Sequence, residues 1–227
     1  MGKRTWSAAV GIVIALGVAL TGCAPSAPAP TGTPVGSPTL SATPEPTAPP
    51  AEDVVAIVVG PLALELVDTT GTPLESFAYD DPSEEARAKL TNLFGEEPVV
   101  EDNSTGKVPN TTYQWAGISI FDRQGDGGEF IPDWSVAVTA SALGEVDFRS
   151  IEGTVVGASV STVRERYPEH PDQVDANGGR HFSISVAETP VGTDDQGNEH
   201  TYSVFISAQD PDSPIESIGA PYTNFGD

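Results

Sequence analysis

Four short segments of the chain alternate apolar residues with small polar residues: 117–121, 134–140, 183–186 and 202–208. Such alternation puts the apolar side chains on one face of a strand and leaves the other face to solvent. The pattern therefore predicts two pairs of half-buried antiparallel strands.

A helix is predicted before the first strand pair. Asp81 provides an N-cap, Pro82 fits the first helical position, and Gly95 ends the segment. The apolar residues between them recur every three or four positions, as one face of a helix requires. They are Ala86, Leu90, Leu93 and Phe94.

A second helix is predicted before the second strand pair. Ser159 or Ser161 caps it, and Pro168 stops it. Its apolar residues are Val160, Val163 and Tyr167. Earlier strands are expected at 62–67 and 74–79 in the first half, and at 146–151 and 153–156 in the second.

The order helix, strand, strand thus occurs twice. Aligning Trp134 with Tyr202 brings the serine, aliphatic and alanine positions that follow them into register. The pattern predicts an α+β fold of two tandem helix-plus-antiparallel-strand repeats, at about 54–142 and 143–227. We expect the repeats to form one sheet with the helices on one face.

Residues 157–168 read Gly-Ala-Ser-Val-Ser-Thr-Val-Arg-Glu-Arg-Tyr-Pro. They resemble the Gly-x-Ser-x-x-x-Val-x-x-x-Tyr turn and helix of the beta-lactamase-inhibitor proteins and related small envelope lipoproteins. The resemblance implies a tandem-repeat fold with helices packed on one face of an antiparallel sheet. No inhibitor contact residue carries over to this chain, so the resemblance concerns the fold and not a target.

The N-terminus has the features of an export signal. Lys3 and Arg4 precede an apolar run at 8–20, which is shorter than the ~18 residues of a membrane-spanning helix. Leu20-Thr21-Gly22-Cys23 follows and resembles the lipobox of bacterial lipoproteins. The resemblance implies a signal peptide at 1–22 and lipidation of Cys23. A transmembrane anchor, or a secretory signal cleaved elsewhere, remains an alternative.

The segment 23–52 consists of the acylated cysteine and a linker rich in proline, threonine and alanine. This composition buries too little apolar surface to fold, so we expect a disordered, extended spacer ahead of a globular domain at 53–227. The few lysines and abundant alanine, glycine and valine are typical of GC-rich genomes, such as those of actinobacteria.

Charge limits the range of partners. The full chain carries a net charge of −23, and removal of the signal leaves eight basic and 33 acidic residues, a net charge of −25. A surface of this sign repels nucleic acids and anionic lipid headgroups. Cys23 is the only cysteine, so the domain has no disulfide to stabilise it.

The sequence predicts no catalytic, metal or cofactor site. His170, His181 and His200 lack metal-ligand spacing, and the acidic loops 122–129 and 194–199 lack the donor spacing of an EF-hand. Calcium at these loops is an alternative to ordinary turns, which the same residue types form. The adjacent carboxylates at 80–81, 84–85 and 96–97 give no evidence of two carboxyls across a cleft. We expect Trp115 and Trp134 to fill the core rather than line a groove.

These observations favour a lipid-anchored protein on the extracytoplasmic face of the cell membrane. We expect a noncatalytic binding or scaffolding module, held at the membrane by its anchor, with an envelope protein or cell-wall partner. A cell-wall-acting hydrolase and a small ligand-binding lipoprotein are the alternatives, and the sheet face that no helix covers is the expected contact surface.

Overall fold

A computed structural model describes residues 53–125, 127–170, 173–174 and 179–224. These residues fall within one compact unit, Ala48–Asp227. The predicted signal peptide, the lipobox, Cys23 and the linker lie outside the described residues. Across the described residues, no helix has the length and apolar character needed to cross a bilayer.

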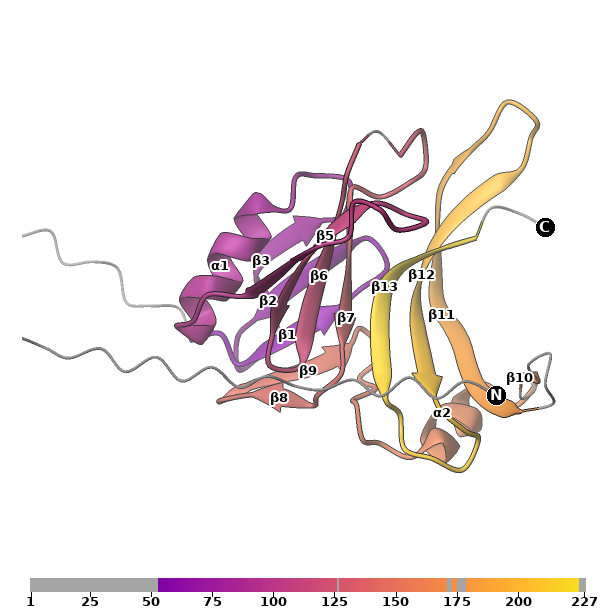
Figure 1. The fold of residues 1–227 in the computed structure, drawn as a ribbon. Coiled ribbons are helices and arrows are strands. Elements are labelled where there is room, and N and C mark those ends of the chain that lie inside the picture. The colour runs from indigo at the N-terminus through magenta and orange to yellow at the C-terminus, as the bar shows by residue number, and fades with distance from the viewer. Residues whose placement is uncertain (1–52, 126, 171–172, 175–178, 225–227) are drawn as a thin grey trace, which may run out of the picture. The chain divides into compact units, whose positions relative to one another are not determined.

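The first of two sheets has the strand order β3-β2-β1-β9-β8 (Figure 1). Its strands are β1 (Ala56–Val59), β2 (Ala63–Val67), β3 (Pro73–Ala78), β8 (Ala142–Leu143) and β9 (Val146–Ser150). The β1–β9 pair is parallel and the other pairs are antiparallel. All four residues of β1 are buried, which explains why this strand is a continuous apolar run without alternation.

The second sheet is antiparallel and has the order β10-β11-β12-β13-β7-β6-β5-β4. Its first-half strands are β4 (Val99–Asp102), β5 (Asn110–Trp115), β6 (Ile118–Arg123) and β7 (Trp134–Val138). Its second-half strands are β10 (Gln173–Val174), β11 (Arg180–Thr193), β12 (Glu199–Ala208) and β13 (Ser217–Asn224). Each half is a meander of consecutive neighbours, and the two meanders join where β7 pairs with β13.

Helix α1 (Glu84–Phe94) precedes the first meander, but it begins later than predicted. Ser83, not Asp81, is the residue before its first turn, and the Ser83 hydroxyl donates to Asp122 (2.8 Å) instead of capping the helix. A tertiary contact has therefore replaced the predicted cap. Gly95, at φ 68°, ends the helix as expected, because only glycine adopts this left-handed conformation at little cost.

Helix α2 (Val160–Arg166) precedes the second meander and confirms the prediction for this segment. The Ser159 side chain accepts from the backbone N–H of Ser161 at 3.2 Å, which is an N-cap. Val160 and Val163 are buried in the core.

The core lies between the two sheets and includes the buried faces of both helices. Phe94 of α1 contacts Trp115 of β5 and Phe148 of β9 edge-on, at 6.1 and 6.2 Å between ring centroids, and so links the sheets. The guanidinium of Arg164 in α2 lies over the Phe182 ring of β11. Both helices and the five-stranded sheet thus contact the same face of the eight-stranded sheet.

Trp134 is 1% exposed, and its indole N–H lies within hydrogen-bond distance of the carbonyls of Ala78 (3.1 Å) and Asp81 (2.9 Å). Trp115, at 3% exposure, donates to the carbonyl of Glu96. The expectation that both tryptophans fill the core is confirmed.

The expectation of an α+β fold with one sheet is confirmed only in part: the two helices and the antiparallel strands are present, but the strands do not form one sheet. The described chain is mainly β, with two short helices and two sheets. The hydrophobic pattern does not reveal β1, β5 or β13. β1 lacks alternation, most residues of β5 are polar, and β13 contains Gly219 and Pro221. The segment 153–156, expected to be a strand, forms no strand.

The alignment of Trp134 with Tyr202 matches two strands that do not occupy the same position in their meanders. Trp134 begins β7, the last strand of the first meander, whereas Tyr202 lies in β12, the third strand of the second. By position in its meander, β7 corresponds to β13. The two strands match in pattern because both put alternate apolar residues into the same core.

Tyr167, directly after α2, provides a test of this end of the fold. Desolvation, followed by its hydrogen bond to Glu152, raises its pKa to about 12. The unfolded value is about 10, so the neutral hydroxyl stabilises the fold below pH 10, and this contribution is lost as the pH rises from 10 to 12. We expect Tyr167→Phe to lose stability less steeply over that range, as measured by denaturant unfolding at several pH values. Identical pH profiles for the two proteins would contradict the assignment.

Candidate functional site

One face of the eight-stranded sheet points away from the core. We call it the outer face. Its central positions alternate along each strand with buried residues of the core, such as Ile118, Val136 and Ile206. Its side chains are mostly small or aromatic. They belong to Ser119, Phe121, Ser135, Ala137, Phe205, Ser207, Ser217, Gly219 and Tyr222.

An aromatic pair stands on the second-half side of the outer face. The rings of Phe205 and Tyr222 stack with centroids 5.0 Å apart and planes 23° apart, and Tyr222 is 49% exposed. Next to this pair is a hollow of about 410 Å³, which serine hydroxyls and the side chains of His181 and Glu188 also line. A rigid ring pair beside hydroxyl groups offers apolar contact and hydrogen bonding at one place.

The centre of the outer face is shallow. Gly219 of β13 pairs with Ala137 of β7, and Ala137 pairs with Ser119 of β6. Gly219 has no side chain, so the surface is low at this position. A methyl group there would lie 3.2 Å from the carbonyl oxygen of Val136. The strip runs from the aromatic pair toward Phe121, which lines a second hollow of about 230 Å³ with Arg123.

The central strip carries no charged side chain, although the full chain has a net charge of −23. Its charged neighbours lie toward the rim, for example Arg123 at the end of β6 and Glu188 on β11. An uncharged centre with a polar rim is the usual anatomy of a protein–protein interface.

No protein-family model, curated protein or solved structure matches this chain.

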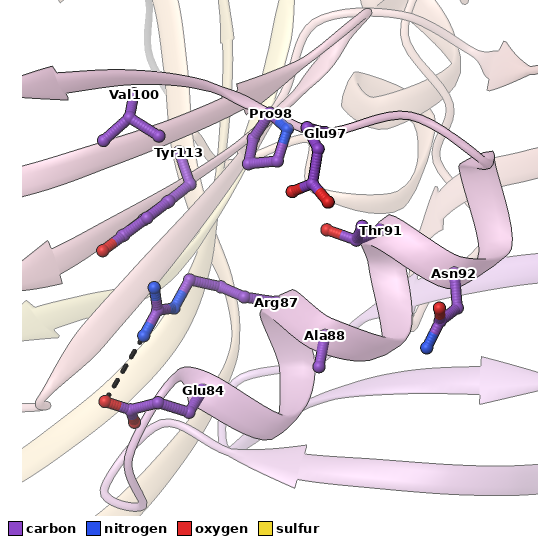
Figure 2. Close-up of a pocket in the computed structure, with 9 residues that line it drawn as sticks. All are labelled: Glu84, Arg87, Ala88, Thr91, Asn92, Glu97, Pro98, Val100 and Tyr113. Atoms are coloured by element: carbon purple, nitrogen blue, oxygen red, sulfur yellow. Dashed lines mark ion pairs between the residues drawn. The ribbon is translucent and has the colours of Figure 1, made fainter.

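A groove of about 460 Å³ runs along α1, between the helix and strands β4 and β5 (Figure 2). The Arg87 guanidinium lies in it, 4.1 Å from the centroid of the Tyr113 ring and 3.3 Å from the Glu84 carboxylate. Its Nε donates to the Ser83 hydroxyl. These contacts hold the arginine against the groove wall.

The groove brings together two of the acidic residues considered for hydrolysis, Glu84 and Glu97. In Figure 2 they come from different ends of the groove, and Glu84 forms an ion pair with Arg87. Asp80, from another acidic pair, accepts a hydrogen bond from the Tyr202 hydroxyl (2.9 Å). The fold thus ties Glu84 and Asp80 to specific partners.

The two acidic loops have structural roles in the described chain. Asp194 accepts from the backbone N–H groups of Gln196 and Asn198 and from the Asn198 side chain, and these bonds lower its pKa to about 2. Asp122 accepts from Ser83, and Asp126 lies outside the described residues. Within the described ranges, no three acidic, histidine or cysteine side chains come close enough to hold a metal ion.

His170 and His181 both line the hollow beside the Phe205–Tyr222 pair, whereas His200 lies at the start of β12. The ring nitrogen Nε2 of His170 is 2.7 Å from the carbonyl oxygen of Ser183, and His181 lies in β11. His200 stacks on Phe130 (4.7 Å between centroids) and is 3.3 Å from Asp194. Gly192 leaves space for the Phe130 ring, because a methyl group there would lie 2.0 Å from it.

An uncovered sheet face was predicted from the sequence, but not the residues that form it. Tyr222 and Gly219 lie in β13, a strand that the hydrophobic pattern did not reveal. The stack of Tyr222 on Phe205 depends on the β12–β13 pairing, which a bulge between Ser203 and Phe205 interrupts. The sequence gives one sign of this surface. Phe205 is an aromatic residue at an outward-facing position of an alternating strand.

Proposed function

We propose that this chain is a lipid-anchored, noncatalytic protein of the outer cell surface, and that its outer face binds a partner protein of the envelope. The observation that carries the proposal is the uncharged strip of small residues between the Phe205–Tyr222 pair and Phe121. We further infer that the two meanders derive from tandem repeats, each consisting of a helix and four strands.

The composition of the outer face supports a protein partner. Aromatic rings supply rigid contact area at a small entropic cost, while serine and glycine allow close approach and adaptable hydrogen bonds, as in antibody paratopes. The rings project from paired strands of a sheet, so little conformational entropy is lost when a partner binds.

The size of the surface is also sufficient. The eight strands are on average about seven residues long, and at about 3.3 Å per residue and about 4.8 Å between strands they cover roughly 900 Å². A standard protein interface buries about 800 Å² on each partner. The outer face with its flanking loops is therefore close to the size that a specific complex requires.

The predicted anchor and linker fit this role. A diacylated, N-acylated Cys23 would hold the chain at the bilayer, since two or more acyl chains anchor a protein stably. A proline-rich linker at ~3.1 Å per residue would reach roughly 80 Å. That distance separates the acidic domain from the anionic membrane surface.

A hydrolase is less well supported. Two catalytic carboxyls need a separation of about 5 to 10 Å across a cleft. The two glutamates of the groove, Glu84 and Glu97, come from different ends of it, and the ion pair with Arg87 neutralises Glu84.

Photocrosslinking on intact cells tests the proposal. A photoreactive residue in place of Ala137, at the centre of the outer face, should yield a discrete protein adduct. The same residue in place of Ser76, an exposed position on β3, should not. Adducts consisting only of cell-wall fragments, or equal labelling from both positions, would contradict a protein-binding outer face.

A matched pair of variants then measures the contribution of the aromatic pair. Tyr222→Ala should weaken binding of the captured partner about tenfold or more, because exposed aromatic residues at an interface centre are frequent hot spots. Ile151→Ala removes an apolar side chain of similar exposure (52%). Ile151 directly follows β9, a strand of the five-stranded sheet, so this variant should leave the affinity unchanged. Equal affinities for all three proteins would place the contact elsewhere.

A further inference from the structure

Strand β4 forms one edge of the eight-stranded sheet and pairs with β5. Its two valines are exposed to solvent although they are apolar: Val99 is 63% and Val100 56% exposed. Exposed edge strands can accept an additional strand, because one row of their backbone groups points away from the sheet.

The register identifies which backbone groups of β4 point outward. Asn103 donates its backbone N–H to the carbonyl of Asn110 on the β5 side (2.9 Å), and antiparallel hydrogen bonding alternates from residue to residue. The backbone groups of Glu101 therefore face β5, while those of Val100 and Asp102 face outward. Pro98 has no N–H to offer, but its carbonyl lies on the same outward row.

The open edge adjoins the groove along α1. Val100 pairs with Tyr113, and both side chains line this groove (Figure 2). A strand added beside β4 would direct every second side chain toward the same face, and hence into the groove. The groove volume of about 460 Å³ is within the ~300 to 1,000 Å³ typical of ligand sites.

The charges around this edge favour a basic binding partner. Four carboxylates lie along the groove and the strand, from Glu84, Glu97, Glu101 and Asp102. The cation that lines the groove, Arg87, is already paired with Glu84. A second copy of the chain, paired through β4, would bring like charges together, whereas a basic segment would complement them.

We propose that the edge of β4 is a docking site for an extended, positively charged polypeptide segment. The segment adds to the sheet as a ninth strand, bonds to the backbone of Val100 and Asp102, and directs alternate side chains into the groove along α1. This site is separate from the outer face, so the two proposals stand or fall independently.

The test uses the full-length protein and a peptide of about six residues in which lysine and valine alternate. An NMR titration should show binding, with shift changes centred on Val100 and slower amide exchange at Val100 and Asp102. A peptide of alternating glutamate and valine should not bind. Methylating the amide nitrogens on one edge of the lysine peptide should weaken binding about tenfold, through lost hydrogen bonds, and methylating those on the other edge should not.

Two variants at one position provide the protein control. Val100→Pro removes an outward N–H and blocks the edge without breaking a β4–β5 hydrogen bond, so it should reduce affinity about tenfold. Val100→Thr keeps the N–H and a β-branched shape, and should bind like the unaltered protein. The proposal is overturned if the lysine peptide does not bind, if the glutamate peptide binds equally well, if both Val100 variants bind alike, or if the shifts centre on Tyr222.

Discussion

Replacing Trp134 with alanine is expected to lower the free energy of unfolding by about 3 to 5 kcal/mol, the usual cost of truncating a large buried aromatic residue. The ring is 1% exposed and packs edge-on against Tyr79, 4.8 Å away between centroids. Its N–H also anchors the segment that leads into α1, through the carbonyls of Ala78 and Asp81. Denaturant unfolding of the two proteins measures the difference.

Two controls separate packing from hydrogen bonding in this result. Trp134→Phe keeps an aromatic ring but removes the donor, so its loss should be smaller than that of the alanine variant. Tyr222→Ala removes an exposed ring and should change stability by no more than about 0.5 kcal/mol. Equal losses for Trp134→Ala and Tyr222→Ala would mean that the tryptophan does not hold the two segments together.

Replacing Cys23 with serine is expected to abolish lipid labelling and to release the protein from the membrane fraction. A serine hydroxyl cannot form the thioether of the predicted lipid anchor, and without acyl chains nothing in the acidic domain favours an anionic membrane. Labelling with a radioactive fatty acid, followed by cell fractionation, measures both effects.

Ser26→Ala, just beyond the lipobox, is the matched control and should remain labelled and membrane-bound. Full membrane retention of the Cys23→Ser protein would instead support a transmembrane anchor. Secretion of the unaltered protein without label would support a signal cleaved at another position. Each result thus selects one of the three interpretations of the N-terminus.

Sequence reasoning was most successful where local chemistry determines structure. The cap at Ser159, the stop at Gly95 and the alternating strands around Ile120, Val136 and Val204 were all identifiable from the sequence. In these segments, neighbouring residues determine the conformation.

It was less successful where distant segments supply the partner. The run at Ala56–Val59 has no period of its own, and it becomes a strand because β2 and β9 cover its two edges. Ser83 has the sequence context of a helix start, yet its hydroxyl donates a hydrogen bond to Asp122. The Phe205–Tyr222 pair and the β4 edge likewise depend on strand order, which one sequence does not specify.

The parallel pairing of β1 with β9 has a consequence for how the chain folds. Ala56 pairs with Asp147, and Val136 with Ala220, so both junctions between the halves close very long loops. Such nonlocal pairing makes folding slow, because much chain entropy is lost before the contacts form. The five-stranded sheet can close once β9 is present, but the two meanders of the eight-stranded sheet join only when β13 pairs with β7. If the chain is exported as proposed, the eight-stranded sheet stays open to envelope proteases until β13 has crossed the membrane.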